Sequence, residues 1–209
     1  MHQKGLINKI IETTKMTLCN PNFTPTSQVA SGSDPEGDNW ENEDWNYASV
    51  VGMLLYVSNN TRPDIAFAVS QVARFTAKPK ASHARAIKSI VRYLKGTANK
   101  GLVFTVNDNY DLACWVDADF AGSFGREPPN LPQSVKSRCG CVIKFGGIPL
   151  VWKSQLISEM HTSTCHAEHV RLSNALRRLI PIRNLVMWLL GQLELPDQKT
   201  SMGLSLIHI

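Results

Sequence analysis

The segment Leu112-Ala113-Cys114-Trp115-Val116-Asp117-Ala118-Asp119 carries the pattern that decides the fold of this 209-residue chain. Its first five residues, Leu112–Val116, are apolar and predict a buried strand. A carboxylate such as Asp117 at the end of an apolar strand costs free energy unless it is paired or bound to a metal ion. Asp119 follows two positions later, so both side chains lie on the same side of an extended segment. The segment therefore predicts a strand that ends in a charged site.

A hairpin and a helical region follow this strand. Cys139–Phe145 and Pro149–Lys153 alternate as strands do, and Gly146-Gly147 between them predicts a tight turn. Residues 160–196 have helical patterning, with Thr162, Ser163 or Thr164 as the cap and Pro181 as the start of a further helix. A further strand is expected before the segment, at Gly101–Val106. Together these elements predict an α/β class, α+β overall, with a mixed sheet and flanking helices.

Glu168 lies on the predicted helix that follows the three-stranded meander, and a strand-end Asp packed against a helix Glu can hold a divalent cation. Hard cations prefer carboxylate oxygens, so Asp117 and Glu168 are candidate metal ligands, with Asp119 as a third. Two such cations ~4 Å apart drive in-line phosphodiester hydrolysis. The alternative is that Asp117 and Asp119 shape a turn while Glu168 is a solvated helix residue. Spacing alone leaves both interpretations open.

Residues 47–98 predict three helices. The first is Tyr47–Ser58, apolar on almost every side, and the second begins at Pro63. Ser82 is the expected N-cap of the third helix, which ends at Gly96. Basic residues spaced three or four apart form a ridge beside the apolar stripe of this third helix, namely Arg85, Lys88, Arg92 and Lys95. The ridge is either a solvated face or a surface that follows nucleic-acid phosphates.

Composition and charge exclude several classes of protein. Hydrophobic residues make up 43% of the chain, which excludes wholesale disorder and fibrous repeats. The net charge of +5 conceals an acidic linker within residues 34–44, because the chain from Trp45 onward has 19 basic and 10 acidic residues. That surplus suits a polyanionic partner, although basic residues also solvate helix surfaces. There is no secretory signal, no apolar run of the ~20 residues that a membrane helix needs, and no Cys-x-x-Cys pair. An intracellular protein, cytoplasmic or nuclear and without a membrane partner, is expected.

Six sequence blocks resemble the Pol polyprotein of copia-type long-terminal-repeat retrotransposons, at the junction of the reverse transcriptase and the RNase H domain. The blocks occur in the family order and span most of residues 1–195. They are Tyr47–Tyr56, Thr61–Val69, Arg92–Thr97, Val116–Gly122, Trp152–Ser154 and Ser163–Glu168.

The resemblance implies a domain plan and a site. Residues 1–46 are a reverse-transcriptase loop and acidic linker, 47–100 a three-helix thumb and tether, 101–196 a partial RNase H-like domain, and 197–209 a tail outside the family. Asp117 and Glu168 occupy the positions whose carboxylates bind the Mg²⁺ that cleaves RNA in RNA–DNA hybrids; Asp119 belongs to the same motif. The implied partners are an RNA–DNA hybrid or other nucleic acid, bound in part by Arg85, Lys88, Arg92 and Lys95, and the rest of the polyprotein.

Departures from the family pattern bear on activity. His166 and His169 replace a usual Glu and Tyr around Glu168. No strand-borne Asp follows the last helix as a third metal ligand, and the final strands of the fold are not expected. The chain is therefore expected to be an inactive fragment of a reverse transcriptase and ribonuclease H. Two alternatives stay open: a nucleic-acid-binding remnant without chemistry, and an inert pseudogene product that does not fold alone.

Overall fold

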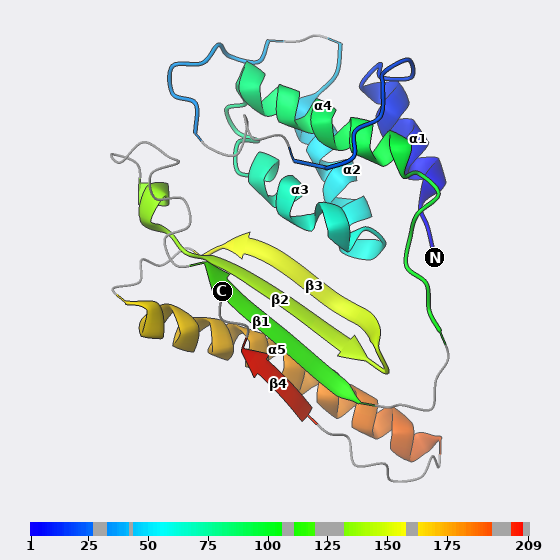
Figure 1. Cartoon of the computed structure of the whole chain (residues 1–209), viewed down its shortest axis with the longest axis vertical. Coiled ribbons are helices and arrows are strands. Elements are labelled where there is room, and N and C mark those ends of the chain that lie inside the picture. Colours follow the sequence, from blue (N-terminus) through cyan, green and yellow to red (C-terminus); the bar gives the residue numbers. More distant parts are fainter. Residues whose placement is uncertain are drawn as a thin grey trace. The chain divides into compact units, whose positions relative to one another are not determined.

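The chain has a helical unit and a unit built on a β-sheet. The computed structural model describes residues 1–26, 33–41, 44–105, 111–119, 132–157, 163–193 and 202–206. The chain divides into Met1–Val103 and Phe104–Ile209, and each unit is described by itself (Figure 1). Within the described ranges, no helix is both long and apolar enough to cross a membrane. The expected mixed class of helices and a sheet is confirmed.

Four α-helices and one 3₁₀ turn build the first unit. In chain order they are α1 (Lys4–Thr13), α2 (Tyr47–Asn60), η1 (Pro63–Ile65), α3 (Ala66–Ala73) and α4 (Ala81–Gly96). The helices expected between residues 47 and 98 are therefore present, and the segment Lys4–Thr14, open to strand or helix from its sequence, is a helix. Side chains with no exposed surface, among them Ile7, Val50, Leu54 and Ile87, form one core.

The start of α4 differs from the expectation that Ser82 caps it. The helix begins at Ala81, and the backbone N–H of Lys80 donates to Nδ1 of His83 at 3.1 Å. His83 is buried and stacks on Phe75, with ring centroids 3.8 Å apart. Ser82 instead lies in the first turn, where its buried Oγ has no hydrogen-bond partner among the described residues. The buried imidazole satisfies the helix start in place of the serine.

The described part of the acidic linker packs on the first unit. The rings of Trp40 and Trp45 lie 4.9 Å apart, and Trp45 stacks on Tyr47 at 6.3 Å. Trp45 is 6% exposed and belongs to the core. Lys15 and Asp44 form an ion pair beside it. The linker is thus anchored by its aromatic residues, despite its acidic composition.

A four-stranded sheet organises the second unit. Its strands are β1 (Leu112–Asp119), β2 (Arg138–Phe145), β3 (Ile148–Leu156) and β4 (Met202–Leu206), in the order β3-β2-β1-β4 (Figure 1). β1–β2 and β2–β3 pair antiparallel, whereas β4 runs parallel to β1. A 3₁₀ turn, η2 (Pro132–Val135), precedes β2. The meander follows the sequence-based expectation, and β4 lies in the stretch expected to be a tail, where no strand was expected.

The turn between β2 and β3 shows why two glycines are needed. Gly146 and Gly147 have φ values of 57° and 80°, which favour residues without a Cβ. By contrast, the strand expected at Gly101–Val106 is wrong for residues 101–105, which have no regular structure. In the part of the chain that the structure describes, these residues join no sheet, and the amide of Leu102 instead donates to the carbonyl of Met1 at 3.0 Å.

A single long helix, α5 (Thr164–Gln192), packs against β1 and β2. Ser163, one of the three expected caps, accepts from the amide of His166 at 3.1 Å. The expectation that Pro181 starts a new helix is wrong, because Pro181 lies inside α5. A proline removes one helical hydrogen bond, but buried residues on both sides, Leu179 and Val186, hold one continuous helix in place.

The core of the second unit lies between α5 and the sheet. Leu112, Cys114 and Val116 alternate along β1 as its buried positions, and Ala175 and Leu179 face them from α5. Cys139 and Cys141 of β2 join this core, as expected of small buried residues, and Sγ of Cys141 lies 4.0 Å from Sγ of Cys114. This packing fixes which face of α5 meets the sheet.

Candidate functional site

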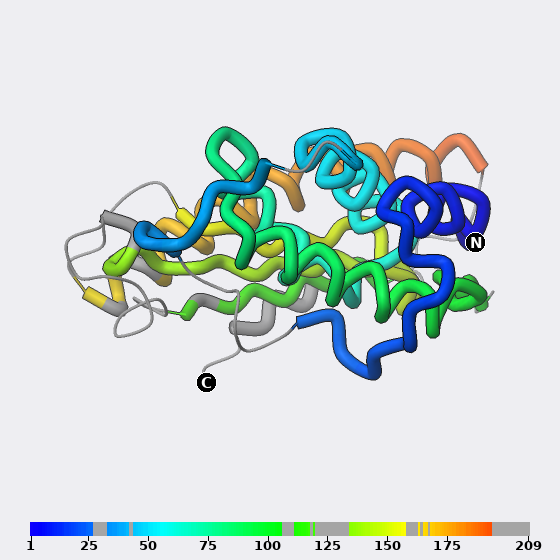
Figure 2. The backbone as a smooth tube through the Cα atoms, turned by 90° about the horizontal axis from the view of Figure 1, so that it is seen from above, coloured from blue at the N-terminus to red at the C-terminus, as the bar shows by residue number. Residues whose placement is uncertain are grey.

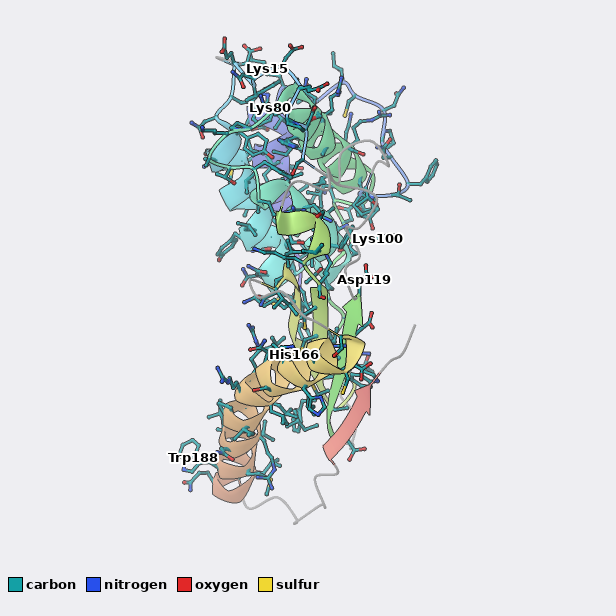
Figure 3. The ribbon with its side chains drawn as sticks, turned by 90° about the vertical axis from the view of Figure 1, so that its left-hand side faces the viewer. Lys15, Lys80, Lys100, Asp119, His166 and Trp188 are labelled. Carbon is teal, nitrogen blue, oxygen red and sulfur yellow. The ribbon has the colours of Figure 1, made fainter. Side chains whose placement is uncertain are left out.

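Asp117 lies inside β1, two residues before the strand ends. It pairs with Gly140 of β2, and Asp119 pairs with Arg138. The parallel partner β4 reaches only Val116, so the two carboxylates belong to the part of β1 beyond that pairing. Figure 3 labels Asp119 at the end of β1, where it is exposed, and His166 in the first turns of α5. The charged site predicted at the end of the strand therefore lies on the extended strand itself.

The first turns of α5 bring a cation to Asp117. Glu168, half-buried, is followed one turn later by Arg171. Nη1 of Arg171 lies 3.7 Å from Oδ1 of Asp117, with the two side chains 4% and 38% exposed. That separation exceeds a hydrogen bond, so the pair is electrostatic. Nε of Arg171 is buried without a hydrogen-bond partner among the described residues.

Further positive charge lies beside the same part of the sheet. Burial raises the pKa of the Cys139 thiol, and the nearby Arg171 and Arg178 oppose that rise. Burial lowers the pKa of Lys153 on β3, and the positive charge of Arg178 lowers it further. Arg171 and Arg178 of α5 thus both lie near Cys139 of β2, as Asp117 does, and Arg171 is the cation in contact with Asp117.

These residues do not fit a Mg²⁺ site. In the ranges that the structure describes, no three His, Cys, Asp or Glu side chains gather as a group that could hold a metal ion. Asp117, Asp119 and Glu168 therefore do not converge on one point, and a guanidinium stands beside Asp117. Sγ of Cys165 lies 3.5 Å from Nδ1 of His169, but this is a pair only. Mg²⁺ requires near-octahedral oxygen ligands, which this arrangement does not offer.

The basic ridge of α4 contacts the chain's own N-terminal loop. Nε of Arg92 donates to the carbonyl of Asn20 at 2.7 Å. Nζ of Lys95 donates to the carbonyls of Thr17 and Cys19 at 2.6 Å and 2.7 Å. Figure 2 shows the segment after α1, in blue, beside the green helix α4. Two of the four expected nucleic-acid contacts are thus engaged within the chain.

The other two ridge residues differ in exposure. Nζ of Lys88 lies 5.8 Å from the ring centroid of Trp40, a cation–π contact with the anchored linker. Arg85 is exposed. Arg85 is therefore the ridge residue whose side chain is presented most openly to solvent.

The comparisons with known proteins point to one family. The chain is 31% identical, over 89% of its length, to the retrovirus-related Pol polyprotein from transposon TNT 1-94 of Nicotiana tabacum. It is 29% identical, over 83% of its length, to the corresponding polyprotein from transposon RE1 of Arabidopsis thaliana. The chain belongs to the family of copia-type Pol polyproteins. The expectation from the six sequence blocks is thereby confirmed.

The match covers a small part of each Pol polyprotein. This Pol segment spans 14% of the TNT 1-94 protein and 11% of the RE1 protein. A shorter relative, secreted RxLR effector protein 161 of Plasmopara viticola, is 32% identical over 64% of the chain, and the match covers 89% of that protein. No family model and no solved structure matches the chain.

Sequence reasoning missed the two buried arginines of this Pol segment. The burial of Arg171 was not predicted, because a basic residue on a helix usually faces solvent. Its signal is the spacing to Ala175 and Leu179, which places it on the buried stripe of α5. Arg62 lies within the family block Thr61–Val69, and its side chain is 2% exposed and ion-paired with Asp64. The adjacent Arg-Pro-Asp sequence was the available signal.

Proposed function

We propose that this Pol segment combines the helical end of a reverse transcriptase, in Met1–Val103, with an RNase H-like unit, in Phe104–Ile209. The six family blocks support this assignment, and so does the meander β3-β2-β1 followed by α5 and the parallel strand β4. One observation carries it furthest: the strand β1, which bears Asp117, packs against the helix α5, which bears Glu168. An acidic residue on a strand and another on the helix that covers it are what the family resemblance implies for this class of nuclease.

In the whole polyprotein the proposed activity is metal-dependent cleavage of the RNA strand of RNA–DNA hybrids during reverse transcription. The rest of the polyprotein is the proposed partner. We expect this chain by itself to lack turnover. The parallel strand β4, Met202–Leu206, contains no acidic residue, and Asp117 faces Arg171 where a cleavage site needs a metal ion.

A cleavage assay on a defined substrate tests this proposal. The RNA strand of an RNA–DNA hybrid is end-labelled and incubated with the chain and Mg²⁺, beside Asp117→Asn and a catalytically active RNase H. We expect uncleaved RNA with both forms of the chain. RNA cleavage by the wild-type chain that disappears in Asp117→Asn would contradict the expected lack of turnover.

Nucleic-acid binding by the first unit is the second candidate, and the exposed Arg85 on α4 favours it. Phosphate contacts make affinity fall steeply with salt, so binding to a hybrid is measured over a salt series. Removing one phosphate contact, as in Arg85→Ala, reduces the salt slope by about one. Lys9→Ala on α1 is the exposed control. Binding that does not depend on salt, or an unchanged slope in Arg85→Ala, would exclude this surface.

A further inference from the structure

We propose that Arg171 is a built-in cation that balances Asp117 and excludes a divalent metal ion from the acidic end of β1. The inference rests on the proposed RNase H-like character of the second unit and goes beyond it, because it assigns the charge of the site to a side chain. The cation that stands beside the Asp117 carboxylate is then the guanidinium of Arg171 on α5, in place of a metal ion.

The position of Arg171 is fixed by packing. Arg171, Ala175 and Leu179 follow each other at intervals of four residues, so they lie on one face of α5. Ala175 and Leu179 are each 2% exposed in the core of the unit, and Arg171 is 3% exposed. An arginine occupies a place on the helix where this stripe is otherwise apolar, and it cannot turn away into solvent without leaving the core face.

A buried guanidinium needs a counter-charge. Burial of a charge is costly unless the charge is paired and hydrogen-bonded. Nε of Arg171 has no hydrogen-bond partner among the described residues, so the cation is incompletely satisfied by neutral groups. The carboxylate of Asp117, 3.7 Å from Nη1, supplies the opposite charge. Asp117 on β1 therefore offsets part of the cost of burying Arg171 on α5, and Arg171 offsets part of the cost of placing Asp117 beside the core.

A divalent ion competes for the same carboxylate. Mg²⁺ binds carboxylate oxygen at about 2.0–2.1 Å, so its centre at Asp117 would lie close to the guanidinium. Like charges at such a separation repel, and the burial of Arg171 on one side of the pair weakens the screening by water, although Asp117 itself is 38% exposed. Arg178, two turns after Arg171 on α5, adds a second positive charge near Cys139 of β2, where it opposes the rise of the thiol pKa caused by burial. The arrangement thus favours the internal cation over an external one.

The test is a Mn²⁺ titration of the full chain, with free Mn²⁺ followed by electron paramagnetic resonance. The wild-type chain is compared with Arg171→Met, which keeps the length of the side chain but not its charge, and with Arg171→Lys, which keeps the charge. Arg177→Met, at an exposed position of α5, is the matched control. Circular dichroism establishes that each variant is folded.

We expect Arg171→Met to bind Mn²⁺ at least about tenfold more tightly than wild type, since a like charge nearby shifts such equilibria by that much or more. Arg171→Lys and Arg177→Met should match wild type, and Asp117→Asn added to Arg171→Met should abolish the gain. Equal affinities in Arg171→Met and wild type would overturn the inference.

A second comparison applies if Arg171→Met does not fold. Wild-type Mn²⁺ binding that Asp117→Asn leaves unchanged supports the inference, whereas binding that Asp117→Asn removes overturns it. These outcomes are distinct from failure of the proposed function, which is judged by RNA cleavage and by the fold of the second unit. A chain that binds Mn²⁺ through Asp117 refutes the role of Arg171 and leaves the RNase H-like assignment intact.

Discussion

The guanidinium of Arg62 donates to the carboxylate of Asp64 through two nitrogens, with Nη2–Oδ2 at 2.7 Å and Nε–Oδ1 at 2.9 Å. Arg62 also donates to the carbonyl and hydroxyl of Thr97, at 2.9 Å and 2.6 Å. The hydroxyl of Tyr93 donates to Asp64 at 2.7 Å. These bonds join η1 to the end of α4, so the family motifs around residues 62 and 93–97 form one structural network.

Replacing Arg62 should destabilise the first unit. Arg62→Met removes the guanidinium donors from Asp64, which keeps only the Tyr93 hydroxyl, and from the carbonyl of Thr97. We expect a loss of about 2–3 kcal/mol in the free energy of unfolding, below the ~3–5 of a fully buried pair, because Asp64 is partly exposed. Chemical denaturation measures the loss. The exposed Arg85→Met should change the free energy little, and equal effects of the two substitutions would refute the network.

The same pair predicts a pH dependence. Burial alone would raise the pKa of Asp64, but hydrogen bonds from Arg62 and Tyr93 bring it below its ordinary value. A lowered pKa in the folded state gives stability that is present above the unfolded value of about 3.9 and is lost as the pH falls through the lower, folded pKa. Chemical denaturation at a series of pH values, from neutral pH to below the folded pKa of Asp64, should show the midpoint falling as the pH falls.

Asp64→Asn is the control for the pH dependence. It should be less stable at neutral pH and should lose less additional stability on acidification than the wild-type chain. Equal losses of stability on acidification in wild type and in Asp64→Asn would show that another carboxylate is responsible.

The β2–β3 turn should require glycine. Gly147 has a φ of 80°, so Gly147→Ala should cost about 1 kcal/mol or more. Gly52 in α2 offers an opposite control, because a Cβ added there meets nothing within 4 Å. Gly52→Ala should instead stabilise the chain by about 0.5–1 kcal/mol, the usual gain within a helix. Thermal melts of the two variants should shift in opposite directions, and shifts of the same sign would contradict the turn geometry.

Replacing Pro181 should stabilise α5. The proline sits inside a continuous helix and removes one backbone hydrogen bond. We expect Pro181→Ala to raise the free energy of unfolding by about 1–3 kcal/mol and to increase the helical circular dichroism signal. Loss of stability in Pro181→Ala would indicate that the proline marks a helix boundary, as its sequence context first suggested.

The parts of the fold that the sequence predicted are those with strong local patterns. The apolar run that begins β1, the Gly146-Gly147 turn and the almost uniformly apolar sequence of α2 each have a local physical cause. The elements that were missed depend on tertiary contacts. α5 continues through Pro181 because residues on both sides are buried, and β4 forms because β1 offers it a parallel edge.

The candidate site divides in the same way. Asp117 and Glu168 could be placed on a strand and a helix from their patterns and from the family resemblance. Arg171 could not, because its burial follows from the way α5 packs on the sheet. The spacing of the basic residues on α4 is evident in the sequence. The hydrogen bonds of Arg92 and Lys95 to a loop more than 70 residues away cannot be predicted from local sequence.

The architecture of the second unit is the central claim, and backbone nuclear Overhauser contacts in the isotope-labelled chain test it most directly. We predict antiparallel contacts between Val116 and Cys141 and parallel contacts between Cys114 and Leu204, which place β1 between β2 and β4. A β1 strand with no parallel neighbour, or a helical signature at Asp117, would contradict the RNase H-like assignment.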